Sequence, residues 1–200
     1  MSLQVEQRAG VKPHVISLDE YERMCEAGVF EPEARLELIR GEIVDMAPPG
    51  PEHENSVTRL NLFLGEQLGR RALVWPQGNS IRLPGSNSRP QPDLTVLRWR
   101  DDLYSGKRPT AEDVILLIEV SESSLKYDRG SKRALYAEAG IAEYWVVNLV
   151  EGVVEVYTEP SEGEYRSVRT VRRGEMLQLP PDLGGSIAVA DVLGKVRGRK

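Results

Sequence analysis

The chain contains 200 residues, of which 40% are hydrophobic and 28% are charged. These proportions are typical of one globular domain with a sizeable core, and they exclude an intrinsically disordered chain. The formal net charge of -5 argues against non-specific coating of nucleic acid, but it does not exclude an enzyme whose acids bind a divalent cation that meets phosphate.

Cys25 is the only cysteine, so the chain can form no intrachain disulfide and no cysteine-based zinc site. The N-terminal residues MSLQVEQRAG contain no apolar run typical of a signal peptide. No segment approaches the roughly 20 apolar residues of a membrane-spanning helix. We therefore expect a cytoplasmic protein with no membrane partner.

The N-terminal part of the chain predicts a lead-in and one short helix. Residues 1–16 have little periodicity and are expected to be a poorly held lead-in. Ser17 is a good N-cap, and Glu20 completes a capping box three residues later. The helix is expected to stop at Gly28, because glycine readily adopts the left-handed conformation that follows a helix.

The residues ARLELIRGEIVDM predict a two-stranded hairpin that turns at Arg40 and Gly41. Glu37 lies inside the first strand between two leucines, and strand alternation places it on the opposite face from both. This position fits either a functional acid or an exposed ion pair between Glu37 and a neighbour such as Arg35.

A proline-rich stretch, APPGPEHE, precedes a helix that is expected to begin at Glu52 and to end at Gly69. Its apolar stripe repeats at spacings of three and four residues and consists of His53, Val57, Leu60, Leu64 and Leu68. His53 begins the stripe and faces inward, where a histidine is more often a satisfied core or capping residue than a ligand.

The middle of the chain predicts strands joined by loops. ALVWPQGNSIRLPG is strand-like, with a bend or bulge at residues 76–78. PDLTVLR is a strand that begins at Pro92, and VILLIEV is a continuous apolar run typical of a strand covered on both faces. Residues 99–112 between these two strands are expected to form an exposed connection.

The last part of the chain predicts a helix followed by strands. Asp128 can cap a helix that continues to Gly140, and IAEYWVVN is another buried strand. A strand, a helix and a strand within about 35 residues predict a right-handed crossover with parallel pairing. After a turn at residues 151–152, VVEVYTEP is expected to continue antiparallel. YRSVRTVRRGEMLQLP then predicts edge strands, PDLGGSIAVADVLGK a short closing strand or turn, and the basic residues 195–200 a solvated tail.

Two of the apolar strands each carry one acid at an end. Asp93 begins the first and Glu119 lies near the end of the second, so both could reach one ion at neighbouring strand ends. A buried glutamate needs a partner or a metal, which favours a functional role for Glu119. Lys132 lies in the first turn of the following helix, and Glu37 could supply a third carboxylate. Acids that hold Mg²⁺ or Mn²⁺ and a lysine that balances phosphate charge are what a metal-dependent phosphodiesterase needs.

Several separate motifs of the chain resemble the Uma-two family of endonucleases, a branch of the PD-(D/E)XK, or restriction-endonuclease-like, nucleases. The matching motifs, in order, are RLELIRGEIVDM, the proline-rich approach to His53, QPDLTVL, LLIEVSESSLKYDRGSKRALYAEAGIAEYWVVN and VEVY. The resemblance implies an α/β fold with a restriction-endonuclease-like mixed β-sheet flanked by helices, in a single domain over residues 17–194. It also implies an active site at one sheet edge.

The resemblance assigns roles to five residues: Asp93 and Glu119 as ligands of Mg²⁺ or Mn²⁺, Lys132 as catalytic, Glu37 as an auxiliary catalytic acid, and His53 as a weaker candidate nearby. The general nuclease motif would place a lysine two residues after Glu119, where this chain has Ser121. The chain is similar to the variant in which the lysine comes from the following helix. The long, flexible lysine stem allows this, because only the ammonium matters.

The residues alone also fit readings without catalysis. Asp93 after a proline is often a turn-forming acid, and Lys132 could pair with Asp128 on a helix surface. The serines at 121, 123 and 124 lack the glycine-flanked elbow of a serine hydrolase. The chain is therefore predicted to be a metal-dependent endonuclease of DNA. The alternatives are a non-catalytic binding or assembly module with a nuclease fold, or a hydrolase of RNA or small phosphate esters.

A homodimer is expected as well. Cutting both strands of a duplex requires two active sites, and the exposed strands after residue 150 offer edges for self-association.

Overall fold

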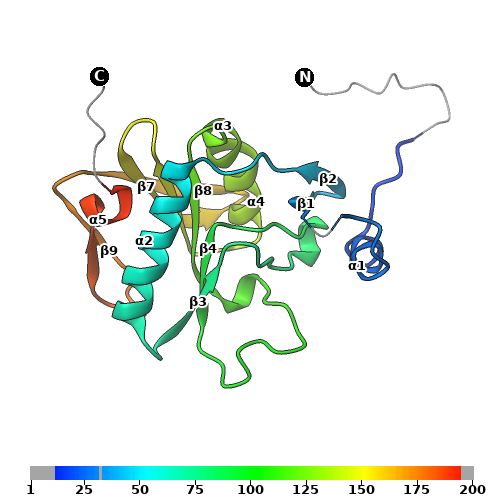
Figure 1. Cartoon of the computed structure of the whole chain (residues 1–200), viewed down its shortest axis with the longest axis horizontal. Coiled ribbons are helices and arrows are strands. Elements are labelled where there is room, and N and C mark those ends of the chain that lie inside the picture. Colours follow the sequence, from blue (N-terminus) through cyan, green and yellow to red (C-terminus); the bar gives the residue numbers. More distant parts are fainter. Residues whose placement is uncertain (1–11, 32, 195–200) are drawn as a thin grey trace.

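The structure is a computed structural model that describes residues 12–31 and 33–194 (Figure 1). Most of the expected lead-in and the whole of the expected basic tail, residues 195–200, lie outside the described residues. Residues 12–17, which are described, form no helix or strand.

A mixed six-stranded sheet forms the centre of the molecule. Its strands, in spatial order, are β3 (Ala72–Pro76), β4 (Leu94–Arg98), β5 (Val114–Ser121), β6 (Glu143–Asn148), β7 (Val153–Ser161) and β8 (Glu164–Arg172). Only the β5–β6 pair within this sheet is parallel, as the strand–helix–strand pattern predicted. Every residue of β5 is buried, which confirms the prediction of a strand covered on both faces.

Helices cover both faces of the sheet. On one face, α2 (Pro51–Leu68) and α5 (Val189–Leu193) pack their apolar side chains on alternate strand residues such as Leu116 and Ile118. On the other face, the intervening Leu117 packs in a second cluster with Tyr136. This alternation follows from the two-residue period of a strand. It confirms the prediction of a mixed sheet flanked by helices in a single domain.

The predicted apolar stripe of α2 is the main anchor of the first face. Leu60, Leu64 and Leu68 are buried in the core cluster, and Val57 is partly buried against it. The helix begins at Pro51, one residue before the expected start, because proline fits the first position of a helix where its missing N–H costs nothing.

The helix α1 (Leu18–Glu26) begins and ends as predicted. Ser17 accepts a hydrogen bond from the Glu20 backbone N–H, and the Glu20 carboxylate accepts one from the Ser17 backbone N–H, which completes the capping box. Gly28 follows the helix with a φ of 67°, in the left-handed region.

The predicted hairpin consists of β1 (Leu36–Ile39) and β2 (Glu42–Asp45), which lie beside α1 at one end of the molecule (Figure 1). Its turn has positive φ at both central residues, 53° at Arg40 and 79° at Gly41. A Cβ atom at Gly41 would clash with Cγ1 of Val15, so only glycine fits this position without movement of a neighbour.

The helical segment after β5 differs from the prediction in its start. It runs through α3 (Leu125–Tyr127), the π-helical turn η3 (Asp128–Lys132) and α4 (Arg133–Glu138). The prediction that Asp128 caps this helix is wrong. Asp128 lies within the helical segment, and its carboxylate accepts hydrogen bonds from serine hydroxyls instead of helix-end amides. Lys132 therefore ends the π-helical turn and does not lie in the first turn.

The remaining segments extend the fold around the sheet. The bend expected at residues 76–78 ends β3, and the chain beyond it makes only isolated bridges near the 3₁₀ turns η1 (Pro84–Ser86) and η2 (Ala111–Asp113). β8 is an edge strand as predicted, whereas β9 (Met176–Gln178) pairs with β10 (Ser186–Ala188) in a separate small sheet.

The short helix α5 was not predicted. The apolar residues Val189, Val192 and Leu193 recur at helical spacing and are buried against α2, so tertiary packing decides the conformation. The Ser56 hydroxyl of α2 donates to the Val192 carbonyl at 2.9 Å and fixes the contact. No helix within the described part of the chain is long and apolar enough to cross a membrane.

Candidate active site

The two strand acids lie together where β4 begins and β5 ends. Leu94 pairs with Ile118 across the antiparallel strands, and the next position brings Asp93 beside Glu119. The backbone N–H of Asp93 donates to Oε2 of Glu119 at 3.4 Å, and both acids are buried. Two adjacent carboxylates at neighbouring strand ends can act on one bound group.

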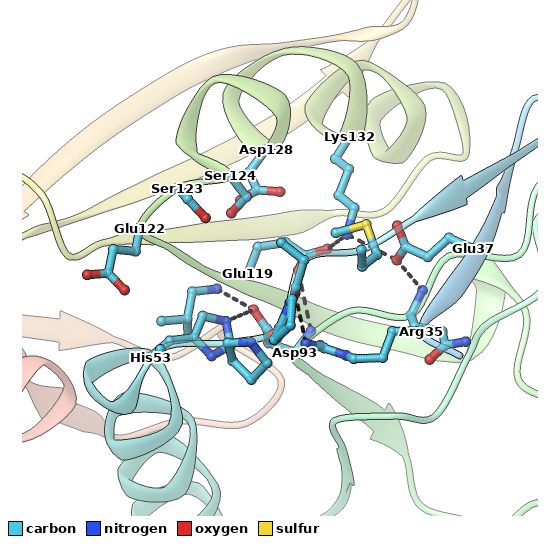
Figure 2. A pocket seen from close by; sticks show the side chains of 17 residues that line it. Arg35, Glu37, His53, Asp93, Glu119, Glu122, Ser123, Ser124, Asp128 and Lys132 are labelled. Carbon is cyan, nitrogen blue, oxygen red and sulfur yellow. Dashed lines mark hydrogen bonds and ion pairs between the residues drawn. The ribbon is translucent and has the colours of Figure 1, made fainter. Parts of the chain in front are cut away.

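Lys132 reaches this pair from the helical segment above it (Figure 2). Its Nζ lies 3.0 Å from Oε1 of Glu119 and 3.1 Å from Oε1 of Glu37. The lysine is 1% exposed. The reading of Lys132 as a surface residue paired with Asp128 is therefore wrong, because its ammonium points into the site and not into solvent.

Glu37 enters the site from the hairpin. Strand alternation does turn it away from the leucines, but this face lies against the site, and Glu37 is 1% exposed. Its Oε1 also accepts the backbone N–H of Gln91 at 2.6 Å. The alternative of an exposed pair with Arg35 is wrong, since Arg35 donates to the Ala47 carbonyl instead.

Glu119 accepts two further hydrogen bonds and is surrounded by other charges. Its Oε1 accepts hydrogen bonds from Lys132 Nζ and from the Tyr136 hydroxyl, the latter at 2.7 Å. Burial raises the pKa of Glu119 well above its ordinary value, the Lys132 charge opposes this, and the negative charges of Asp93 and Asp128 raise it further. The ionised form of Glu119 is therefore disfavoured in this site, and the Lys132 ammonium is the charge that opposes this effect.

The ammonium of Lys132 remains protonated in this environment. Burial alone lowers the pKa of Lys132, but the carboxylates of Glu119 and Glu37 raise it by more, so that it lies well above the ordinary lysine value. A charged ammonium fixed between two acids is suited to contact a developing negative charge on an adjacent group.

Asp93 makes three hydrogen bonds through its carboxylate. Oδ1 accepts from Gln77 Nε2 at 2.6 Å, and Oδ2 accepts from the Val120 backbone N–H at 2.8 Å. His53, in the first turn of α2, lies with Nε2 3.0 Å from Oδ2. Because an ionised carboxylate can only accept, this contact places a proton on Nε2 of His53. Nδ1 of His53 is buried without a partner among the described residues.

Asp128 ties β5 to the π-helical turn. Its Oδ2 accepts the hydroxyl of Ser121 at 2.7 Å and the hydroxyl of Ser124 at 2.6 Å. Burial raises the pKa of Asp128, and Lys132 and the two serine hydrogen bonds oppose the rise. We call Ser121, Ser124 and Asp128 the serine–aspartate latch. Ser121 stands where the general nuclease motif would have lysine, so the latch fixes the turn that delivers Lys132 from elsewhere.

Sequence reasoning missed three groups of the site: Gln77, Tyr136 and the latch. Tyr136 follows Lys132 by four residues, and this spacing on a helix signals that both side chains share one face. Gln77 lies within the predicted bend, which carries no signal for a contact with Asp93. The latch also has no local signal, because an aspartate near a helix start resembles an N-cap.

The acids, His53 and Lys132 line a cavity of about 80 Å³, large enough for an ion with a few waters. The cavity has one buried lysine, Lys132, and four buried carboxylates, those of Glu37, Asp93, Glu119 and Asp128. Oε2 of Glu37 has no hydrogen-bond partner among the described residues. Within residues 12–31 and 33–194, no three His, Cys, Asp or Glu side chains are arranged to hold a metal together. The lining of this pocket, rich in carboxylate oxygens, matches the ligand preference of Mg²⁺, which uses one or two carboxylates and keeps waters or binds phosphate.

Comparison with solved structures gives the class of fold. A structure from Anabaena variabilis ATCC 29413, described as "a putative nuclease belonging to DUF820", is similar with a TM-score of 0.69 and 17% sequence identity. The match covers 89% of this chain and 97% of that chain. The chain thus has a nuclease-like fold, as predicted.

The chain belongs to the Uma2 family, described as "Putative restriction endonuclease", which matches residues 18–190. This match confirms the family that the sequence motifs resemble. No curated protein matches the sequence. Family and fold together support a nuclease function in general.

Proposed function

We propose that this protein is a metal-dependent endonuclease that hydrolyses phosphodiester bonds in DNA. The observation that carries the proposal is the buried ammonium of Lys132, held at 3.0 Å from Glu119 and 3.1 Å from Glu37 beside Asp93. A buried ion cluster is weak evidence for stability, because well-packed apolar residues often stabilise a fold as well or better. A site that binds and cleaves a phosphodiester explains why the cluster is present.

In this proposal Asp93 and Glu119 would hold Mg²⁺ or Mn²⁺. The ion would neutralise phosphate charge and lower the pKa of a bound water. Lys132 then orients the attacking water and donates hydrogen bonds to the phosphate oxygens as their charge grows. Glu37 holds the ammonium of Lys132 in place, and His53 orients the carboxylate of Asp93 through Nε2.

The plasmid assay tests the proposed reaction. Purified protein is incubated with supercoiled plasmid and about 10 mM Mg²⁺ or Mn²⁺, roughly tenfold above a millimolar dissociation constant. The expected products are nicked or linear DNA. EDTA is expected to stop the reaction, because the carboxylates alone supply no Lewis acid. Intact plasmid with both ions, from protein shown to be folded by circular dichroism, would contradict the proposal.

The time course of this assay also reports on assembly. The proposal includes a homodimer, because a duplex cut needs two sites. Linear product that appears without a nicked precursor supports paired sites, whereas slow conversion of nicked into linear DNA supports one site per encounter. We also propose that the protein acts in the cytoplasm.

The latch is proposed to position Lys132 for the reaction. Replacing both serines, Ser121→Ala with Ser124→Ala, is expected to lower kcat for plasmid cleavage roughly 10- to 100-fold with little change in KM. The reason is that Asp128 loses both donors and the turn that carries Lys132 loses its tie to β5. Ser105→Ala, an exposed serine in the connection between β4 and β5, is the control. A double variant with a lower melting temperature but a parental kcat would make the latch merely structural.

One observation favours a different class of function. Both oxygens of Asp93 already accept hydrogen bonds from the protein itself, so the acid is satisfied without a metal. This arrangement suits a non-catalytic binding or assembly module that keeps the acids for stability. Binding of Mg²⁺, Mn²⁺ or Ca²⁺ separates the two functions, and an RNA substrate in the cleavage assay separates a ribonuclease from a deoxyribonuclease.

A further inference from the structure

A buried arginine lies outside the candidate active site. Arg89 is 8% exposed, and its Nε donates to the Ser80 hydroxyl oxygen at 2.8 Å. Its Nη1 lies 3.7 Å from Sγ of Cys25, and its guanidinium lies over the Tyr21 ring. Among the described residues, no carboxylate lies within ion-pair distance of Arg89. A buried cation without a counter-ion is costly, so the site has unused capacity for an anion.

A second arginine converges on the same point. Nη1 of Arg108 donates to the Ser80 hydroxyl oxygen at 3.2 Å. Partial burial lowers the pKa of Arg108, the positive charge of Arg89 lowers it further, and the negative charge of Glu22 opposes the shift without cancelling it. Arg108 likewise has no carboxylate within ion-pair distance in the described part of the chain. Two guanidinium groups are thus held side by side with no bridging acid.

Ser80 lies between the two arginines and accepts a hydrogen bond from each of them. A hydroxyl offers two acceptor sites and one donor, and the two arginines use both acceptor sites of Ser80. Ser80 therefore holds the guanidinium groups of Arg89 and Arg108 close together at one oxygen atom.

Arg89 and Arg108 line a cavity of about 270 Å³, whereas the buried Ser80 is not among its lining residues. Its other charged lining residues are Arg82, Lys107, Glu22 and Glu26. Arg82 is neutralised locally, with Nε 3.0 Å from Glu22 and Nη2 3.3 Å from Asp19. The remaining cations that line the cavity are Arg89, Lys107 and Arg108, and the remaining acid is Glu26. The cavity is therefore locally positive in a chain whose net charge is -5.

We propose that this arginine pocket, the cavity lined by Arg89 and Arg108, binds a phosphate group. Planar guanidinium groups donate paired hydrogen bonds to phosphate oxygens, and a phosphate between two of them removes their mutual repulsion. The pocket shares no lining residue with the active-site cavity, so it is a separate site. The inference does not depend on the proposed nuclease reaction.

The phosphate has two chemical sources, the backbone of a nucleic acid or a small phosphate anion. Residues 89–91 connect the two cavities along the chain, because Arg89 lines the arginine pocket and Gln91 lines the active-site cavity. A bound polynucleotide could thus place one phosphate in the arginine pocket and another at the acids.

Titration with inorganic phosphate tests the pocket without divalent ions. The full chain and Arg166→Gln, an exposed arginine on β8 that removes the same charge, are expected to gain melting temperature and to bind phosphate in calorimetry. Arg108→Gln is expected to bind phosphate about tenfold more weakly or not at all, since a hydrogen bond to a charged group is lost. Arg89→Gln should behave like Arg108→Gln if circular dichroism shows it to be folded. Equal phosphate responses in Arg108→Gln and Arg166→Gln would overturn the proposal.

Fluorescence anisotropy with a short DNA duplex in EDTA identifies the source. Weaker DNA binding by Arg108→Gln than by Arg166→Gln, with competition by phosphate, supports a backbone phosphate, and the salt slope should fall by about one. Equal DNA binding by these two variants, together with a phosphate response lost in Arg108→Gln, supports a small phosphate anion. A protein that fails to cleave DNA can still give either result. Failure of the nuclease proposal is therefore distinguishable from failure of the phosphate-pocket proposal.

Discussion

Lys132→Met is expected to lower the initial rate of plasmid cleavage by about 100-fold or more, because one positioned cationic donor to a developing charge typically contributes that much. Methionine is close to the lysine stem in length and shape, so the change removes mainly the ammonium. Lys126→Met, an exposed lysine on α3 of the same helical segment, is the matched control and is expected to cleave at the parental rate.

The same variant is expected to lose stability. In the parent, the Lys132 ammonium is the shared partner of two buried acids, Glu37 and Glu119. Removal of one member of a buried ion pair costs roughly 3–5 kcal/mol of stability. Adding Glu37→Gln to Lys132→Met removes one of the orphaned charges and is expected to recover part of the melting temperature without restoring cleavage. Parental cleavage by folded Lys132→Met would exclude a catalytic role for this lysine.

The local parts of the fold could be predicted because a few residues encode each one. The turn at Arg40 and Gly41 needs positive φ at two positions, and the capping box of Ser17 and Glu20 satisfies helix-end donors within four residues. The adjacency of Asp93 and Glu119 followed from one further step, the pairing of their strands.

The parts that could not be predicted depend on contacts between distant segments. Asp128 resembles an N-cap in the sequence, and its real partner, Ser121, comes from the end of a strand. Arg89 resembles a loop residue, and its burial depends on α1 packing on that loop, with Cys25 lying 64 residues away in the chain. In the sequence, Lys132 resembles a surface lysine paired with Asp128. Its burial depends on the hairpin that carries Glu37, which is distant in the sequence.

Divalent ions are expected to stabilise the protein through Asp93 and Glu119. The pocket has four buried carboxylates against one lysine, so a cation that binds the folded state relieves repulsion that the unfolded chain does not have. At an ion concentration about 100 times the dissociation constant the gain is about 2.7 kcal/mol. For a domain of this size that gain corresponds to a melting temperature roughly 5–10 °C higher. Calorimetric titration with Mn²⁺ and with Ca²⁺ gives the affinity independently of cleavage.

Asp93→Asn is expected to abolish this shift, because it removes one charged ligand and preserves the size of the side chain. Its melting temperature without ions is the baseline, since the amide loses part of the hydrogen bonding with Val120 and His53. Asp45→Asn, an exposed acid on β2 of the nearby hairpin, is the control and should keep the full shift. If the parent shows no shift with any of these ions, the acids serve the fold alone and the non-catalytic module becomes the better reading. A shift that survives Asp93→Asn but not Glu119→Gln would instead place the ion on Glu119 without Asp93.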